Sequence, residues 1–167
     1  MWWFDRPTRR AALALGLCAA GAACGFAPAY GPQGGASRLS GQVVVSAPAD
    51  RAGYLLGQRI EERLGFAATG PYTLTVTHDV SRSGLGTGGD GRTTRYQLVG
   101  SARYSLREGT DGPVLAKGTV DDFTGYSATG STVATLAAVR DAEERLMVIL
   151  ADKVVDRLLM AAPDLPS

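Results

Sequence analysis

The chain has few of the residues that build catalytic or metal sites. Its 167 residues include two cysteines and one histidine, His78. The sequence has no His-x-x-x-His pair and no group of carboxylates with metal-ligand spacing, so the usual zinc and hydrolase side-chain sets are missing. It also shows no internal repeat. These absences favour a binding or structural role over catalysis.

The apolar run near the N-terminus is too short to span a membrane. It covers residues 13–24 and ends in the small residues that precede Cys24. A basic opening comes before it, formed by Arg6, Arg9 and Arg10. A basic start, a short apolar core and a small-residue exit are typical of a secretory signal peptide. We predict that residues 1–23 are removed.

Cys24 is the predicted site of lipid attachment. A lipoprotein peptidase needs a cysteine thiol that carries diacylglycerol, and it needs small side chains at the cut. The expected modification is therefore an N-acyl diacylglyceride, with palmitate as a typical acyl chain, and no other cofactor is expected. Gly21 occupies a position that is usually a branched apolar residue, so an ordinary signal peptide with a chance cysteine is the alternative. Gly25 is not the aspartate that commonly retains lipoproteins in the inner membrane, which favours the outer membrane.

Removal of the signal changes the composition. The 17 basic and 16 acidic residues become 14 and 15, so the net charge changes from +1 to −1. This balance gives no bulk attraction to nucleic acid. One cysteine leaves with the signal and the other is acylated, so no disulfide can form within the chain. About 144 residues remain, enough for one domain with a sizeable core.

Residues 24–38 are predicted to form the lipidated N-terminus and a flexible tether. They contain several Gly and Pro residues and show neither helical nor strand periodicity. Such a segment could reach about 45 Å when extended. The folded domain is expected over residues 39–162, followed by a C-terminal tail over residues 163–167.

Two helices are expected. The first covers residues 51–64, with Asp50 as its N-cap and Gly65 as its stop. The second is long, from Thr132 to Met160, with Ser131 as its cap. Both carry an apolar stripe at helical spacing.

Four strands are expected around these helices. A short β-branched run at residues 43–45 predicts the first. Alternation of apolar and polar residues predicts two more, over residues 72–81 and 95–107, although Val99 lies on the polar side of the second. A turn signal over residues 109–113 then leads into a fourth strand over residues 114–123.

The resulting order is β-α-β-β-β-α. We therefore predict an α+β fold in a single domain, with two helices packed on one face of a four-stranded mixed sheet. The first two strands are expected to lie parallel through a right-handed crossover.

Two motifs have simple interpretations. His78 lies in register with the apolar residues of its strand, which favours a core or rim histidine over a catalytic or metal role. The run Gly84–Gly89 matches G-x-G-x-x-G, but a strand pattern follows it where a phosphate-binding loop requires a helix. We interpret this run as a mobile hairpin loop.

A group of arginines across two strands and their loop is the candidate binding site. Its members are Arg82, Arg92, Arg95, Arg103 and Arg107. Guanidinium groups bind phosphate bidentately, so an anionic lipid or glycolipid headgroup is a possible ligand. The alternative is a solvated strand face with ordinary surface charges.

The run Cys24-Gly25-Phe26-Ala27-Pro28-Ala29-Tyr30, together with the order of elements, resembles the LPS-assembly lipoprotein family LptE, particularly its alphaproteobacterial branch. The resemblance implies two helices on a four-stranded sheet and anchoring to the inner leaflet of the outer membrane, on its periplasmic side. It also implies a position inside the LptD β-barrel, a role in barrel assembly and lipopolysaccharide export, and no enzymatic activity. No motif of the family covers the arginines.

Two other functions fit the sequence less well. One is an auxiliary periplasmic lipoprotein of a lipid-transport ABC system, which would bind partner proteins without contacting lipopolysaccharide. The other is a small lipid-anchored hydrolase, which the missing catalytic side chains disfavour.

Overall fold

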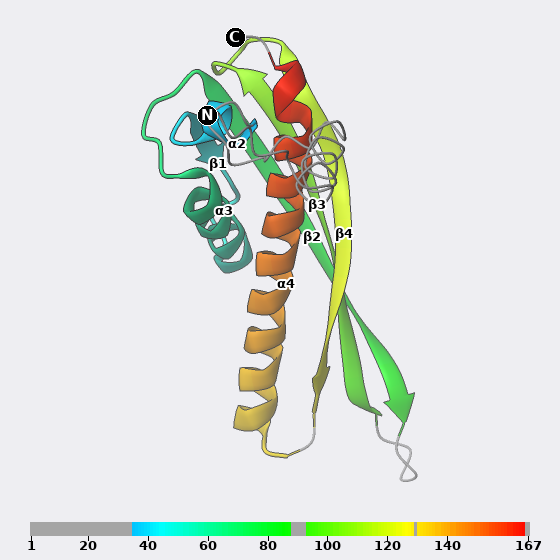
Figure 1. Cartoon of the computed structure of the whole chain (residues 1–167). Coiled ribbons are helices and arrows are strands. Elements are labelled where there is room, and N and C mark those ends of the chain that lie inside the picture. The colour runs from blue at the N-terminus through cyan, green and yellow to red at the C-terminus, as the bar shows by residue number, and fades with distance from the viewer. Residues whose placement is uncertain (1–34, 88–92, 129, 166–167) are drawn as a thin grey trace, which may run out of the picture.

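The computed structural model describes residues 35–87, 93–128 and 130–165. In chain order the elements are α2 (Gly35–Leu39), β1 (Val43–Ser46), α3 (Arg51–Leu64), β2 (Tyr72–Thr87), β3 (Thr93–Glu108), β4 (Val114–Ser127), α4 (Thr132–Ala161) and the 3-10 helix η1 (Ala162–Asp164). Figure 1 shows their arrangement. The signal peptide, Cys24 and Arg92 lie outside the described residues.

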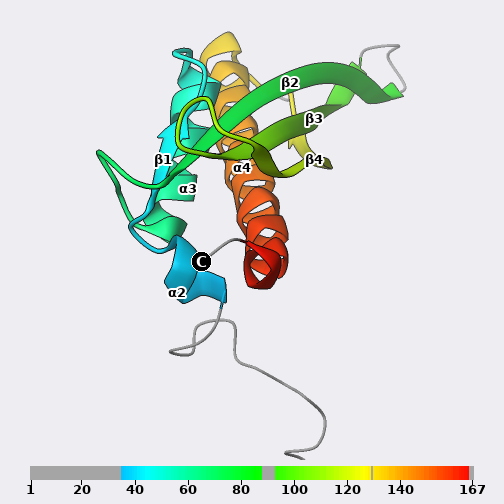
Figure 2. The same ribbon diagram turned by 90° about the horizontal axis from the view of Figure 1, so that it is seen from above.

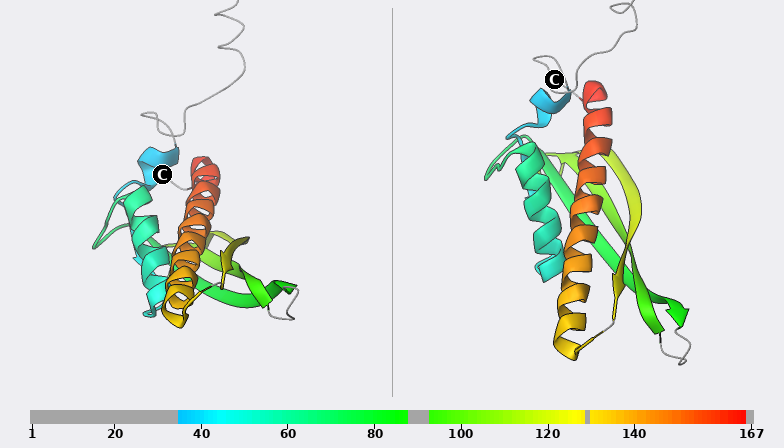
Figure 3. Two further views of the ribbon diagram at one scale, coloured as in Figure 1. Left: turned by 90° about the horizontal axis from the view of Figure 1, so that it is seen from below. Right: turned by 60° about the horizontal axis from the view of Figure 1, so that its bottom comes forward.

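The four strands form one mixed sheet in the order β1-β2-β3-β4. β1 pairs with β2 in parallel, with Val43 opposite Tyr72, and the other neighbours are antiparallel. α3 packs on β1 and β2, while α4 packs on β3 and β4. Figures 2 and 3 show the two helices side by side against the sheet. The predicted α+β fold and the parallel first pair are confirmed.

Both long helices begin at the predicted caps. The Asp50 carboxylate accepts a hydrogen bond from the backbone N–H of Gly53 at 2.7 Å. The Ser131 hydroxyl accepts one from the N–H of Ala134 at 3.2 Å. Each bond satisfies a donor that has no partner within its helix. α3 ends at Gly65, whose φ of 84° suits glycine.

The core lies between the helices and one face of the sheet. Strand alternation places Leu74, Val76, Leu106 and Val120 on this face, and each is buried. α4 contributes its own apolar stripe: Ala142, Leu146, Met147, Leu150, Ala151, Val154, Val155 and Leu158. Full burial of a side chain such as Leu stabilises a fold by about 2–3 kcal/mol. This single layer is the main source of stability.

The glycine-rich hairpin differs from the sequence-based expectation. β2 and β3 each have 16 residues, because pairing continues through Gly84 and Thr87, opposite Tyr96 and Thr93. The interpretation of Gly84–Gly89 as a loop is therefore wrong for its first four residues. Backbone hydrogen bonds hold these residues in the strand without an apolar pattern, and register shifts occur on either side of Gly86.

The two ends of the described chain lie together. α2 contacts η1 and the last part of α4, and the Arg38 guanidinium donates a hydrogen bond to the backbone oxygen of Leu165 at 3.2 Å. Leu39 and Leu165 are both buried. Residues 35–38 of the predicted tether thus lie in α2, and the predicted tail starts at the second residue of η1. We call this end, uppermost in Figure 1, the near end.

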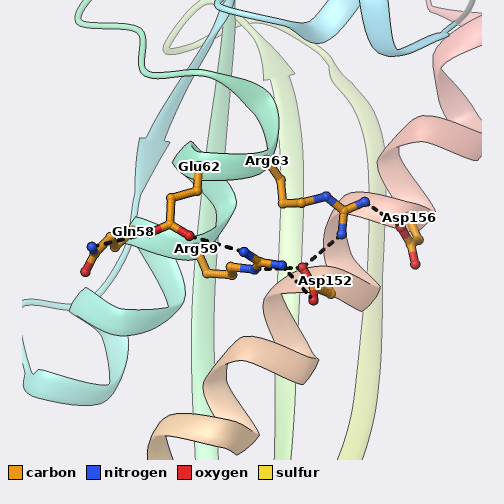
Figure 4. A network of polar contacts seen from close by, with 6 residues as sticks. All are labelled: Gln58, Arg59, Glu62, Arg63, Asp152 and Asp156. Carbon is orange, nitrogen blue, oxygen red and sulfur yellow. Dashed lines mark hydrogen bonds and ion pairs between the residues drawn. The ribbon is translucent and has the colours of Figure 1, made fainter. Parts of the chain in front are cut away.

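An ion-pair network joins the two helices (Figure 4). The Asp152 carboxylate of α4 accepts hydrogen bonds from Arg59 at 3.0 Å and Arg63 at 2.9 Å, both on α3. Arg63 also bonds Asp156 at 3.1 Å, and Arg59 bonds Glu62 at 3.2 Å. The network fixes α3 against α4 along the solvent side of their contact.

Within the described ranges, no helix is both long enough and apolar enough to cross a membrane.

Candidate functional site

The sheet register separates the predicted arginines. Arg82 lies opposite Leu98, a buried residue of the helix-facing side, so Arg82 belongs to that side. Arg95, Arg103 and Arg107 lie on the opposite, uncovered side, as their spacing predicts. The structure therefore does not bring the described members of the group onto one surface.

The three arginines on the uncovered side are also spread along β3. Arg95 and Arg107 are twelve residues apart, which corresponds to about 40 Å in a strand. Arg107 donates a hydrogen bond to the backbone oxygen of Gly112 at 3.1 Å, so it holds the β3–β4 turn. Arg103 is exposed near the middle of the strand. One headgroup cannot contact all three.

Arg82 is held in a stack of aromatic rings. Its guanidinium carbon lies 5.2 Å from the centre of the Tyr96 ring. The Tyr96 and Tyr126 rings stack with centres 5.3 Å apart and planes 13° apart. Arg82 also donates a hydrogen bond to the Tyr126 hydroxyl at 3.3 Å. These contacts fix the cation on β2 by cation–π attraction while the side chain stays exposed.

Neighbouring positions in the sheet produce this stack. Tyr96 and Tyr126 are cross-strand partners on β3 and β4, and Gly84 of β2 is the next partner of Tyr96. Arg82 lies over the Tyr96 ring from a position two residues before Gly84 on the same strand.

The stack lies toward the end of the molecule opposite α2 and η1. We call this the far end: the last residues of β2 and β4 and the first of β3 and α4 lie there (Figure 3). Three apolar side chains are exposed in these parts of the chain: Leu85 at 61%, Val133 at 78% and Leu136 at 50%. The far end therefore combines a fixed cation, aromatic rings and exposed aliphatic groups. This combination suits an anionic amphiphile.

The uncovered side of the sheet also carries an apolar pair. Val99 and Phe123 are direct cross-strand partners, and they are 41% and 61% exposed. Val99 interrupts the polar alternation of its strand in the sequence, but only the register places it beside Phe123. On the same side, Ser81 lies opposite Val99, and Gln97, Ser101 and Asp121 lie at neighbouring positions.

His78 lies on the helix-facing side of β2, with a side chain only 11% exposed. Its Nε2 is 3.6 Å from a carboxylate oxygen of Asp50, and its Nδ1 is buried without a partner among the described residues. This partly buried position agrees with the interpretation of a core or rim histidine. In the part of the chain that the structure describes, no group of three metal-ligating side chains is present.

Comparisons with known proteins agree on the family and the fold. A family model described as LptE, lipopolysaccharide-assembly, matches residues 38–158. A lipoprotein from Caulobacter crescentus is 26% identical, with a TM-score of 0.64 over 80% of this chain and 98% of that one. No curated protein sequence gave a match.

Two more distant structures share the fold. Rare lipoprotein B from Shewanella oneidensis is 13% identical, with a TM-score of 0.55 over 74% of this chain and 94% of that one. A minor lipoprotein from Acinetobacter baumannii is 18% identical, with a TM-score of 0.51 over 75% and 92%.

Proposed function

Because the chain belongs to the LptE family of lipopolysaccharide-assembly proteins, we propose that it is an outer-membrane lipoprotein that partners an LptD-like β-barrel in assembling lipopolysaccharide. The family match carries this proposal, since residues 38–158 include the whole sheet, all of α3 and most of α4. The proposed role is binding and assembly rather than catalysis.

The position of the near end supports a lipid anchor on Cys24. The described chain begins at α2, which lies at the near end, and ten residues separate Cys24 from Gly35. That length reaches at most about 35 Å when extended. An anchored Cys24 would hold the near end toward the periplasmic face of the outer membrane and leave the far end accessible to partners.

We place the contact with lipopolysaccharide at the far end. Lipopolysaccharide carries phosphates beside acyl chains, and the far end contains both the Arg82 stack and the exposed apolar residues Leu85, Val133 and Leu136. Arg95 lies at the same end of β3, on the other side of the sheet. Arg92 lies between Arg82 and Arg95 in sequence, so we include it in the contact. Arg103 and Arg107 are farther along the strand, so we leave them out of this contact.

A binding experiment tests this placement. We expect the double variant Arg82→Gln, Arg95→Gln to bind purified lipopolysaccharide about tenfold more weakly, because each arginine can supply a charge-assisted hydrogen bond to phosphate. Affinity can be measured with the full chain in mild detergent.

Arg103→Gln is the matched control, because it removes an exposed cation from the same sheet and leaves the far end intact. Its affinity should stay within about twofold of the unchanged protein. Equal losses in the control and the double variant would contradict a far-end site.

The barrel partnership needs a separate experiment. A tagged chain should co-purify with a large outer-membrane β-barrel after gentle detergent extraction. Repeated absence of such a barrel would contradict the proposal. Depletion that leaves surface lipopolysaccharide unchanged would instead favour an auxiliary lipoprotein of a lipid-transport system.

A further inference from the structure

β4 forms one edge of the sheet, and it is long. It has 14 residues, pairs with β3 on one side and has no strand on the other among the described residues. The unpaired N–H and C=O groups of an edge strand can pair with another strand, so proteins usually cover or block them. Side chains block one half of this edge and leave the other half open.

Side chains close the second half of the edge. Lys153 of α4 donates a hydrogen bond to the backbone oxygen of Asp121 at 2.8 Å, and Arg145 donates one to that of Gly125 at 3.3 Å. Between them, the backbone N–H of Phe123 donates to the Asp122 carboxylate at 2.7 Å. A partner strand would have to break these contacts.

The first half of the edge is open. Alternate residues of a strand direct their backbone groups to the same side, so Lys117 and Thr119 present theirs to the same edge as Asp121. In the described parts of the chain, no side chain bonds to these groups of Lys117 or Thr119. Edge protection thus ends at Asp121.

A groove begins where the open half ends, at Thr119. Its volume is about 470 Å³, and it lies between residues 119–121 of β4 and the last turns of α4. Met160 lines it and is 69% exposed, so the groove offers an apolar contact. An added strand would direct alternate side chains into this groove and toward the uncovered side of the sheet.

Among the described residues, two cations near the open half form no ion pair, and the exposed Asp121 also lines the groove. Within the groove, Lys153 pairs with Asp122 at 2.6 Å and Asp156 pairs with Arg63 at 3.1 Å. Arg157 in the groove and Lys117 on the uncovered side are exposed, and within the described ranges neither forms an ion pair. The two free cations lie on the two sides that the side chains of an added strand would reach.

We propose that the open half of β4, residues 114–119, binds an extended acidic segment of a partner protein by strand addition. Backbone hydrogen bonds to Lys117 and Thr119 supply affinity, while Arg157 and Lys117 select acidic side chains on both sides of the added strand. This inference goes beyond the role proposed above, because it requires neither lipopolysaccharide nor the far end.

The test uses the full chain in mild detergent and a short blocked peptide that alternates Glu with Val. The control peptide has Lys in place of every Glu. We expect the Glu peptide to bind at least about tenfold more tightly and to slow amide exchange at Lys117 and Thr119. Amides of Phe123 and Gly125 should change little.

Two variants at one position separate backbone from side-chain effects. Thr119→Pro removes the outward N–H, which edge strands tolerate, and should abolish peptide binding. Thr119→Ala keeps that N–H and should bind within about twofold of the unchanged protein. Circular dichroism checks that both variants fold.

Three results would overturn the proposal. One is equal binding of the Glu and Lys peptides, and another is unchanged amide exchange at Lys117 and Thr119. The third is concentration-dependent protection of these amides without peptide, because a second copy of the chain would then occupy the edge.

Discussion

Gly53 is the residue at which α3 passes closest to the loop after β1. A methyl group added there would lie 2.3 Å from the backbone oxygen of Pro48, far inside van der Waals contact. The Pro48 backbone cannot move aside for an added methyl group as a flexible side chain could. Close packing rather than chain flexibility therefore explains the glycine.

We predict that Gly53→Ala destabilises the fold by about 1–3 kcal/mol, because the overlap outweighs the helix propensity that alanine gains. Urea unfolding followed by circular dichroism measures the change. Gln58→Ala, at an exposed position of the same helix, should change stability by less than about 0.5 kcal/mol. A stabilised Gly53→Ala variant would contradict the close approach.

Residues that depend on strand register could not be predicted. His78 was interpreted correctly because it shares the alternation of its own strand. Tyr96 and Tyr126 are 30 positions apart, and only the pairing of β3 with β4 makes them neighbours. Arg82 joins them through an aromatic contact that leaves no local pattern. The sequence therefore indicated the arginine but not the stack that holds it.

At the scale of elements, the predicted parts are those with local signals. α3 and α4 have capping side chains and apolar stripes, so their N-termini were located to the residue. The ends of β2 and β3 carry no such signal, because glycine and threonine continue the pairing through backbone hydrogen bonds alone. Contacts from α4 decide which half of the β4 edge is closed and which is open. The sequence of β4 alone therefore could not predict this difference either.

The contact between α3 and α4 depends on ionised Asp152. Partial burial, the largest single effect, acts to raise the pKa of Asp152, but hydrogen bonds and charge from Arg59 and Arg63 together lower it below 3.8. A carboxyl whose folded pKa is lowered stabilises the fold above its unfolded pKa. That stabilisation is lost as the pH falls through the folded pKa.

We therefore predict that Asp152→Asn costs about 1 kcal/mol at neutral pH, because two arginines lose their shared partner. The difference from the unchanged protein should shrink as the pH falls below the unfolded value of 3.8 and vanish below the folded pKa. Urea unfolding of both proteins at several pH values measures it.

Asp156→Asn is the control. Asp156 contacts only Arg63 of this network and is 55% exposed, so its loss should cost less than about 0.5 kcal/mol. A pH-independent difference for Asp152→Asn would show that its carboxylate charge is not what joins the helices.

At the scale of the whole molecule, the two ends of the fold differ in what they carry. Its described ends meet at the near end, while the Arg82 stack and the exposed apolar residues lie toward the far end. Attachment at Cys24 would turn this difference into an orientation relative to the membrane. The two ends would then face different partners.

We predict that Cys24→Ser abolishes labelling by radioactive palmitate and leaves an uncleaved or soluble protein, because serine has no thiol to carry diacylglycerol. Cys18→Ser is the matched control and should label normally, since Leu17 rather than a small residue precedes Cys18. Continued labelling of Cys24→Ser would refute the anchor.

The position of α4 has a consequence for biosynthesis. This last long helix covers β3 and β4 and also contacts α3, so the core stays open on that side until residues 132–161 are available. A chain delivered N-terminus first presents its strands with their apolar face uncovered and the β4 edge unblocked, because Arg145 and Lys153 arrive later. Such a chain is exposed to aggregation until α4 is available. A holding chaperone would be needed most in the interval between the emergence of β4 and that of α4.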